Sequence, residues 1–391
     1  MGLTRAFGDW RATRAFKALP EPERRIVIYS ESGQDWHHFE PVIAELTDRL
    51  GRHVCYVTSD AADPGLQRQH SRLRGLCIGD GPVRTVFFQF LTARVAVMTM
   101  IDLQNLQLKR SINPVHYVFM FHSLISTHMA DFANSYDHYD TILCAGPHHE
   151  REIRRREELA GLPPKNLVPH GYHRVEQLMA AARAREARPT GDPPRVLLAP
   201  SWGEETTLNV CGEPLIATLL EAGFAVTLRP HYHTRRLTPE LIDGLLTRFG
   251  DHPRFDYVDR MGEDDSLFDS DVMISDWSGA GMDYALGLGK PVLFVDVPPK
   301  SRNETWRELG IEPFESYVRT RIGRVLSPDR LDEAPAAIRA LLSAPAEYAG
   351  DIERLREAWI FNVGGSAAAA ADAIAALADR TPPATGTPPD G

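Results

Sequence analysis

The chain has 391 residues, of which 43% are hydrophobic, and its 53 acidic against 43 basic residues give a formal net charge of −10. This length predicts two domains of about 150 to 200 residues each, because one ordinary core does not grow so large. The negative charge argues against a general nucleic-acid binder, which needs clustered positive charge. No apolar run approaches the ~20 residues of a membrane span.

The cysteines and the N-terminus indicate a cytoplasmic protein. Cys55, Cys77, Cys144 and Cys211 are scattered without C-x-x-C spacing. This pattern favours free thiols in a reducing compartment over disulfides or a zinc site. The N-terminus lacks the apolar core and cleavage site of a signal peptide, so we expect the protein to stay in the cytoplasm.

Residues 1–24 are predicted to form an N-terminal extension, in part an amphipathic helix. Leu3, Phe7, Trp10 and Phe16 share one helix face, with arginines and a lysine around them. Such a helix could associate peripherally with the inner face of the cell membrane, or it could cap the first domain. The sequence leaves both alternatives open.

Residues 25–182 alternate short β-rich runs with helical stretches, which predicts a first domain with a parallel α/β sheet. A polar stretch with three prolines and a glycine, residues 183–194, is the predicted linker. The strands are expected at 26–29, 54–58, 95–98, 117–121, 141–145 and 166–168, and the helices at 41–50 and 83–92.

Residues 195–345 repeat this rhythm and predict a second α/β domain. Its strands are expected at 196–199, 225–229, 255–258, 272–275 and 292–295. C-terminal helices are expected at 346–380, and the Pro-rich tail 381–391 is predicted to be disordered. The fold class is therefore α/β and GT-B-like, with two doubly wound Rossmann-like domains facing a central cleft.

The most informative segment is 271–298, which combines a buried strand, a glycine-bearing turn, a helix and a second strand. The free N–H groups and the dipole at such a helix start attract phosphate. Gly279 permits close approach of a ligand, Ser275 and Ser278 offer hydroxyls, and Asp276 can accept from a ribose or an amide. A plain structural turn is the alternative.

Polar and aromatic side chains follow several other predicted strands, where the carboxyl ends of parallel strands meet. In the second domain Ser201 and Trp202 follow one strand, and Arg229 and His231 follow the next. A guanidinium and an imidazole there suit a diphosphate.

In the first domain His122 follows the strand 117–121 and is the candidate general base. Gln34, His37 and His38 are candidate acceptor-side residues. The acidic cluster Asp264, Asp265, Asp269 and Asp271 is typical of a solvated helix and fits no calcium loop, so neither a metal nor a cofactor is expected.

The turn Ser275-Asp276-Trp277-Ser278-Gly279 resembles the SDYSS-type motif of the CDP-glycerol glycerophosphotransferase family. Ala199–Trp202 resembles the family's A-P-T-W, Arg229–His231 its R-P-H and Gly171–Arg174 its G-Y-P-R. His122 matches the histidine of its H-G-T-P-x-K segment, whose glycine, proline and lysine are absent here.

The resemblance implies a GT-B enzyme of teichoic-acid or capsule polysaccharide synthesis. Such an enzyme transfers glycerol phosphate, or a related polyol phosphate, from a CDP-activated donor to a hydroxyl of a cell-surface polymer or lipid-linked acceptor and releases CMP. It implies His122 as base and His231 at the leaving phosphate. Two alternatives remain: a GT-B glycosyltransferase that uses a nucleotide-sugar, and a non-catalytic nucleotide-binding module, which the absent lysine suggests.

Overall fold

The computed structural model describes residues 2–101, 103–105, 108–186, 190–258 and 265–380. Its contacts divide the chain into two units. The first comprises residues 1–122, 131–173 and 361–391, and the second comprises 123–130 and 174–360. The chain thus passes to the second unit at His173 and Arg174, ahead of the linker predicted at 183–194. Residues 187–189 of that linker and the tail 381–391 lie outside the described residues.

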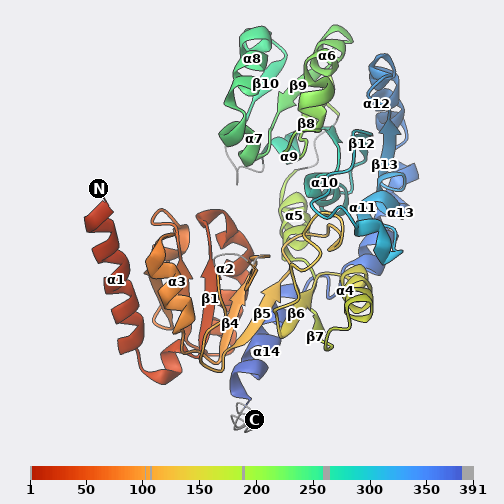
Figure 1. Ribbon diagram of the computed structural model, residues 1–391. Coiled ribbons are helices and arrows are strands. Elements are labelled where there is room, and N and C mark those ends of the chain that lie inside the picture. The colour runs from red at the N-terminus through yellow and green to blue at the C-terminus, as the bar shows by residue number, and fades with distance from the viewer. Residues whose placement is uncertain (1, 102, 106–107, 187–189, 259–264, 381–391) are drawn as a thin grey trace. The chain divides into compact units, whose positions relative to one another are not determined.

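The first unit is built on a seven-stranded parallel sheet in the order β3-β2-β1-β4-β5-β6-β7. Figure 1 labels the part of this order that runs from β1 through β4, β5 and β6 to β7. The strand β3, at one edge, is the one that the sequence did not predict. The strands are β1 Ile26–Ser30, β2 Val54–Thr58, β3 Leu73–Cys77, β4 Val95–Met98, β5 His116–Met120, β6 Thr141–Cys144 and β7 Asn166–Pro169.

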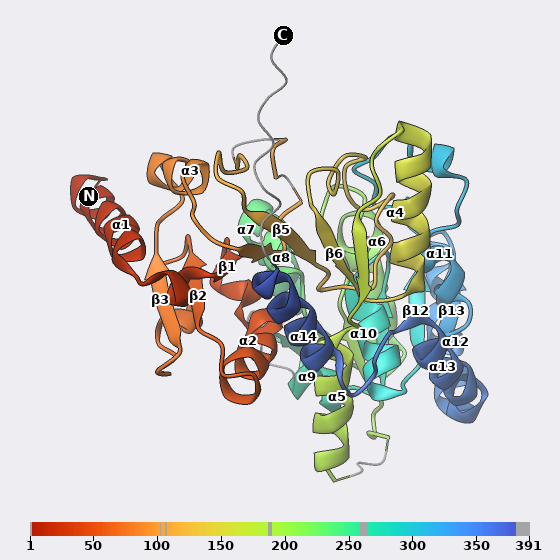
Figure 2. The same cartoon turned by 90° about the horizontal axis from the view of Figure 1, so that it is seen from below.

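Helices cover this sheet because their apolar faces match its buried strands. The C-terminal helix α14 packs beside α2 (Figure 2), where Ala370, Ala371 and Ile374 are fully buried against residues such as Phe39. The helices are α1 Gly2–Ala18, α2 Trp36–Ala44 with a π turn at Glu45–Arg49, α3 Pro82–Gln89, α4 Pro147–Ala160 and α14 Ser366–Asp379, with 3-10 turns at Glu21–Arg24, Gly33–Asp35 and Pro64–Leu66.

The second unit has a six-stranded parallel sheet in the order β10-β9-β8-β11-β12-β13. Its strands are β8 Arg195–Leu198, β9 Ala225–Leu228, β10 Phe255–Tyr257, β11 Val272–Ser275, β12 Val292–Val295 and β13 Gly323–Leu326. Its helices are α5 His173–Ala184, α6 Thr207–Glu221, α7 Tyr232–Leu237, α8 Pro239–Phe249, α9 Asp265–Asp269, α10 Gly279–Leu288, α11 Phe314–Arg319, α12 Ala334–Ser343 and α13 Pro345–Trp359, with 3-10 turns at Trp306–Leu309 and Leu331–Glu333.

Both sheets reverse their strand order beside their first strand, as in Rossmann folds. The predicted α/β class with two Rossmann-like domains is therefore confirmed. The switch point of the first sheet lies between β1 and β4, and that of the second sheet lies between β8 and β11. The loops that follow the two strands at a switch point diverge. Ligands of such sheets bind at the carboxyl ends of the strands at this point.

The N-terminal helix α1 docks on the first unit. Phe16 is 2% exposed, and its ring meets Phe87 of α3 edge-on with centroids 5.0 Å apart. Trp10 stays exposed, while the side chains of Leu3 and Phe7 lie outside the described ones. These contacts support the alternative in which the helix caps the first domain. Among the described residues, no helix is long and apolar enough to cross a membrane.

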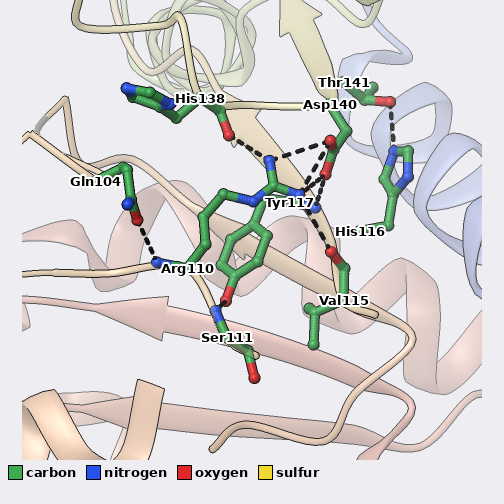
Figure 3. Close-up of polar contacts among 9 residues, drawn as sticks. All are labelled: Gln104, Arg110, Ser111, Val115, His116, Tyr117, His138, Asp140 and Thr141. Atoms are coloured by element: carbon green, nitrogen blue, oxygen red, sulfur yellow. Dashed lines mark hydrogen bonds and ion pairs between the residues drawn. The ribbon is translucent and has the colours of Figure 1, made fainter. Parts of the chain in front are cut away.

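A polar network fastens the amino ends of β5 and β6 (Figure 3). Arg110 donates to Asp140 Oδ2 at 2.8 Å and to the carbonyl oxygen of His138 at 2.6 Å. The Asp140 carboxylate also accepts from the backbone N of Tyr117 at 2.7 Å, and the guanidinium lies 4.7 Å from the Tyr117 ring centroid. This network anchors the loop before β5 at the opposite end of the strands from His122.

Candidate functional site

Four adjacent strands of the second unit, β9, β8, β11 and β12, are each followed by a loop at the carboxyl end of the sheet. The switch point lies between β8 and β11, because the chain continues from β8 outward to β9 and later returns to β11. Every candidate donor residue predicted from the sequence lies at this end of the sheet. Some of these residues bond the loops to one another, and others line the surface of the loops.

Ser275 and Asp276 bond the loops at this end of the sheet to one another. Asp276 is 1% exposed, and its carboxylate accepts from the backbone N of Ser201 at 2.7 Å and from the N and Oγ1 of Thr207 at 3.1 Å each. The Ser275 hydroxyl donates to the carbonyl oxygen of Ala199 at 2.8 Å and is fully buried. Through these bonds both side chains, which were predicted as donor ligands, tie the β8 loop to the β11 turn.

Two glycines at the start of α10, just after its capping residue, differ in the space around them. Ser278 caps α10, and its hydroxyl accepts the N–H two residues on at 3.3 Å. A Cβ on Gly279 would meet Cγ2 of Ile125 at 3.8 Å, an ordinary contact, so this position is open to a ligand. A Cβ on Gly281 would lie 2.9 Å from the Phe294 ring, so this glycine serves helix–strand packing. A helix start with open space beside it suits an anion.

Basic groups surround the indole of Trp202, which extends from the β8 loop. The Lys300 Nζ lies 3.8 Å from its ring centroid, and the Arg302 Cζ lies at 5.4 Å. The rings of His231 and His233 lie at 6.0 and 4.5 Å, centroid to centroid. We name these five residues the Trp202 cluster. Positive groups beside an aromatic face suit a phosphorylated ligand with a planar or ring portion.

His231 presents a neutral N–H donor. Burial, with Lys300 and His233 as further causes, lowers its pKa to about 3. Its Nδ1 accepts the backbone N–H of His233 at 3.1 Å, capping α7. The proton of the neutral ring therefore lies on Nε2, which can donate to an anion without the imidazole becoming charged. Arg229 stays at the same end of the sheet, since its backbone N donates to the carbonyl oxygen of Leu198 at 2.9 Å.

Sequence reasoning missed His233, Lys300 and Arg302, because they match no motif. Lys300 and Arg302 follow β12, the strand beside β11, and this position in the strand order is the signal that could have found them. Of the acidic cluster, Asp264 lies outside the described residues, and Asp271 accepts from the backbone N of Arg195 at 2.7 Å. Within the described ranges, no group of three or more histidines, cysteines or carboxylates could hold a metal ion.

The predicted acceptor-side histidines gather in the first unit. The His38 ring lies 5.0 Å from that of His122 and 3.7 Å from that of His37, centroid to centroid. The His122 Nδ1 is buried and makes no hydrogen bond. Burial lowers the pKa of His122, although Asp131 works against this effect. His122 is therefore held as a neutral imidazole.

The loop after β1 holds Gln34 and a carboxyl group that the sequence did not single out. Gln34 is exposed, and its backbone N donates to the Ser32 hydroxyl at 3.1 Å. Asp35 sits at the start of α2 without making a side-chain cap bond. Burial first, and then the charge of Glu31, raise the pKa of Asp35 to about 6. A carboxyl group tuned toward neutrality can take up or release a proton.

No protein-family model matches the sequence, and a comparison with curated proteins finds no match either. Solved structures do match. UDP-GlcNAc 2-epimerase from Neisseria meningitidis bound to UDP-GlcNAc has a TM-score of 0.58 at 13% identity, covering 90% of this chain and 99% of that one. The S. aureus MnaA–UDP structure has 0.57 at 11%, covering 90% and 95%. A glycosyltransferase from Rickettsia africae has 0.55 at 9%, covering 91% and 99%.

These matches correct the family assigned from the motifs. The similar structures include UDP-GlcNAc 2-epimerases and a glycosyltransferase, so the prediction of a CDP-glycerol glycerophosphotransferase that releases CMP is wrong. At identities this low the likeness establishes the fold alone. The physical reason for the error is that a strand, a glycine turn and a helix start bind a phosphate in many enzymes, whichever group that phosphate carries.

Proposed function

We propose that the second unit binds the diphosphate of a UDP-sugar and that the protein is a glycosyltransferase. The observation that carries this proposal is the Trp202 cluster, which lies at the switch point together with the start of α10 at Gly279. A nucleotide-sugar offers a diphosphate for the basic groups and ring faces for the indole. The uridine nucleotides named for two of the similar structures support this donor class.

The chemistry follows from the charge of the leaving group. As the acceptor oxygen forms a bond to the anomeric carbon, the bond between that carbon and the diphosphate oxygen breaks, and negative charge grows on the departing UDP. Lys300, Arg302 and the N–H at His231 Nε2 would stabilise that charge, with the amides at Gly279. The proton of the acceptor hydroxyl must go to a base. We assign this role to His122, because its lowered pKa keeps the imidazole neutral, and a neutral imidazole has one ring nitrogen that can accept a proton.

A second function, sugar epimerisation, is favoured by Asp35. Inverting a carbon that bears hydrogen requires removing and returning a proton, which suits a carboxyl group with a pKa of about 6. The two functions are separated by incubation with UDP-GlcNAc in D2O and mass spectrometry. Deuterium entering the sugar of intact UDP-sugar indicates epimerisation. UDP release that depends on an added acceptor indicates transfer.

The donor site itself is tested by calorimetry with UDP, with CDP for comparison. Lys300→Met should weaken UDP binding about 10- to 100-fold, the equivalent of a lost charge-assisted hydrogen bond. Lys109→Met is the matched control, because Lys109 is an exposed lysine of the first unit. Equal UDP affinity in wild type and Lys300→Met would remove the Trp202 cluster from the donor site.

A further inference from the structure

The loop after β5 belongs to the second unit, although β5 itself belongs to the first. The chain enters the second unit between His122 and Ser123 and leaves it between Ala130 and Asp131. This segment, residues 123–130, contains neither helix nor strand, yet Ser126 is fully buried and Met129 is 1% exposed. A loop buried to this degree must be held by specific bonds.

Those bonds attach the segment to α11 and to the loop after β12. The Ser126 hydroxyl donates to Glu315 Oε1 at 3.1 Å, in a buried contact. The His128 Nε2 donates to the carbonyl oxygen of Ile311 at 3.1 Å. The Asn303 side chain donates to the carbonyl oxygen of His128 at 2.9 Å. The segment is thus fixed from both sides.

The loop after β12, to which the segment is bonded, also supplies two members of the Trp202 cluster. The backbone N of Arg302 donates to the carbonyl oxygen of Met129 at 3.1 Å, and Lys300 lies two residues earlier. The segment therefore adjoins the loop that brings positive charge to the candidate donor site.

Ile125 is the residue of the segment that meets the phosphate turn. Its neighbours Leu124 and Ser126 are buried, whereas Ile125 keeps part of its surface exposed. Its Cγ2 lies 3.8 Å from the position that a Cβ on Gly279 would take. A branched apolar side chain thus borders the open space above the turn.

We propose that Ile125 forms a wall of the donor site in the second unit and contacts the bound nucleotide-sugar through its Cγ2 methyl group. This inference rests on the proposed function, since it assumes that the donor binds at Gly279. An apolar wall there excludes water beside the turn, which strengthens the amide–phosphate hydrogen bonds. It also offers a surface to the carbon face of a ribose or sugar ring.

The test compares three substitutions that treat Cγ2 differently. Ile125→Val keeps this methyl group, Ile125→Leu moves the branch one carbon outward, and Ile125→Ala removes it. By calorimetry, Ile125→Val should bind UDP-GlcNAc within two-fold of wild type. Ile125→Ala and Ile125→Leu should bind at least about four-fold more weakly, the equivalent of one methyl group no longer buried. Ile112→Ala, at an exposed position of the first unit, is the control.

Hydrogen exchange gives a measurement that needs no variant. Saturation of wild type with UDP-GlcNAc should slow amide exchange in residues 123–130 as well as around Gly279. If neither UDP nor UDP-GlcNAc binds wild type, the proposed function fails and the inference falls with it. If they bind, but Ile125→Ala and Ile125→Leu keep wild-type affinity or exchange in 123–130 is unchanged, this inference alone is overturned.

Discussion

A pair of glycine substitutions tests where the phosphate lies. Gly279→Ala should leave the fold intact, because the new methyl group would meet Cγ2 of Ile125 at 3.8 Å, an ordinary van der Waals distance. Gly279 is also the first residue of α10, where alanine is preferred to glycine, so the free energy of unfolding should stay equal or rise by up to ~1 kcal/mol. The same methyl group would occupy the space above the turn, and UDP affinity should fall at least about ten-fold, or ~1.4 kcal/mol.

Gly281→Ala is the matched opposite. Its Cβ would lie 2.9 Å from Cε1 of Phe294 and 3.4 Å from Cβ of Ser275, both within the packed interior of the second unit. Overpacking of this kind costs about 1 to 3 kcal/mol. We therefore expect Gly281→Ala to lower the free energy of unfolding, while any Gly281→Ala protein that remains folded should bind UDP with affinity close to that of wild type.

Urea unfolding gives the stability of each variant, and calorimetry with UDP gives the affinity. We expect Gly279→Ala to lose UDP affinity and Gly281→Ala to lose free energy of unfolding. Wild-type UDP affinity in folded Gly279→Ala would show that the phosphate does not approach this turn.

Three further predictions concern metal, pH and the first unit. EDTA should change UDP affinity less than about two-fold, because Lys300, Arg302 and a helix start can neutralise the diphosphate without a divalent ion, whereas abolished binding would point to a metal-built site. The folded-state pKa of His231, about 3, lies below its unfolded value of about 6.5, so its contribution to stability is full above pH 6.5 and is lost as pH falls toward 3. In urea unfolding, wild type should thus lose up to ~1.4 kcal/mol per pH unit relative to His231→Gln over that range, and parallel pH profiles would contradict this assignment. Arg110→Met should cost about 1 to 3 kcal/mol of unfolding free energy by breaking the bonds to Asp140 and His138, yet leave UDP affinity unchanged; a loss of affinity would mean that this network serves the site.

The sequence by itself determined most strands of both sheets. The strands 54–58, 95–98, 272–275 and 292–295 have the bounds that were predicted, because a strand buried on both faces is a short apolar run between turns. It missed β3 and β13, which lie at sheet edges and contain a glycine and an arginine each, so their apolar pattern is interrupted.

Only the tertiary structure decided which polar side chains of the second unit bond within the protein. Ser275 and Asp276 belong to a phosphate-type motif, but folding turns their side chains toward Ala199, Ser201 and Thr207, far away in the sequence. The indole of Trp202 meets the ammonium group of Lys300 for the same reason. A local motif fixes the backbone of one turn, whereas the charged and aromatic groups around Trp202 come from separate loops that meet only when the sheet has formed.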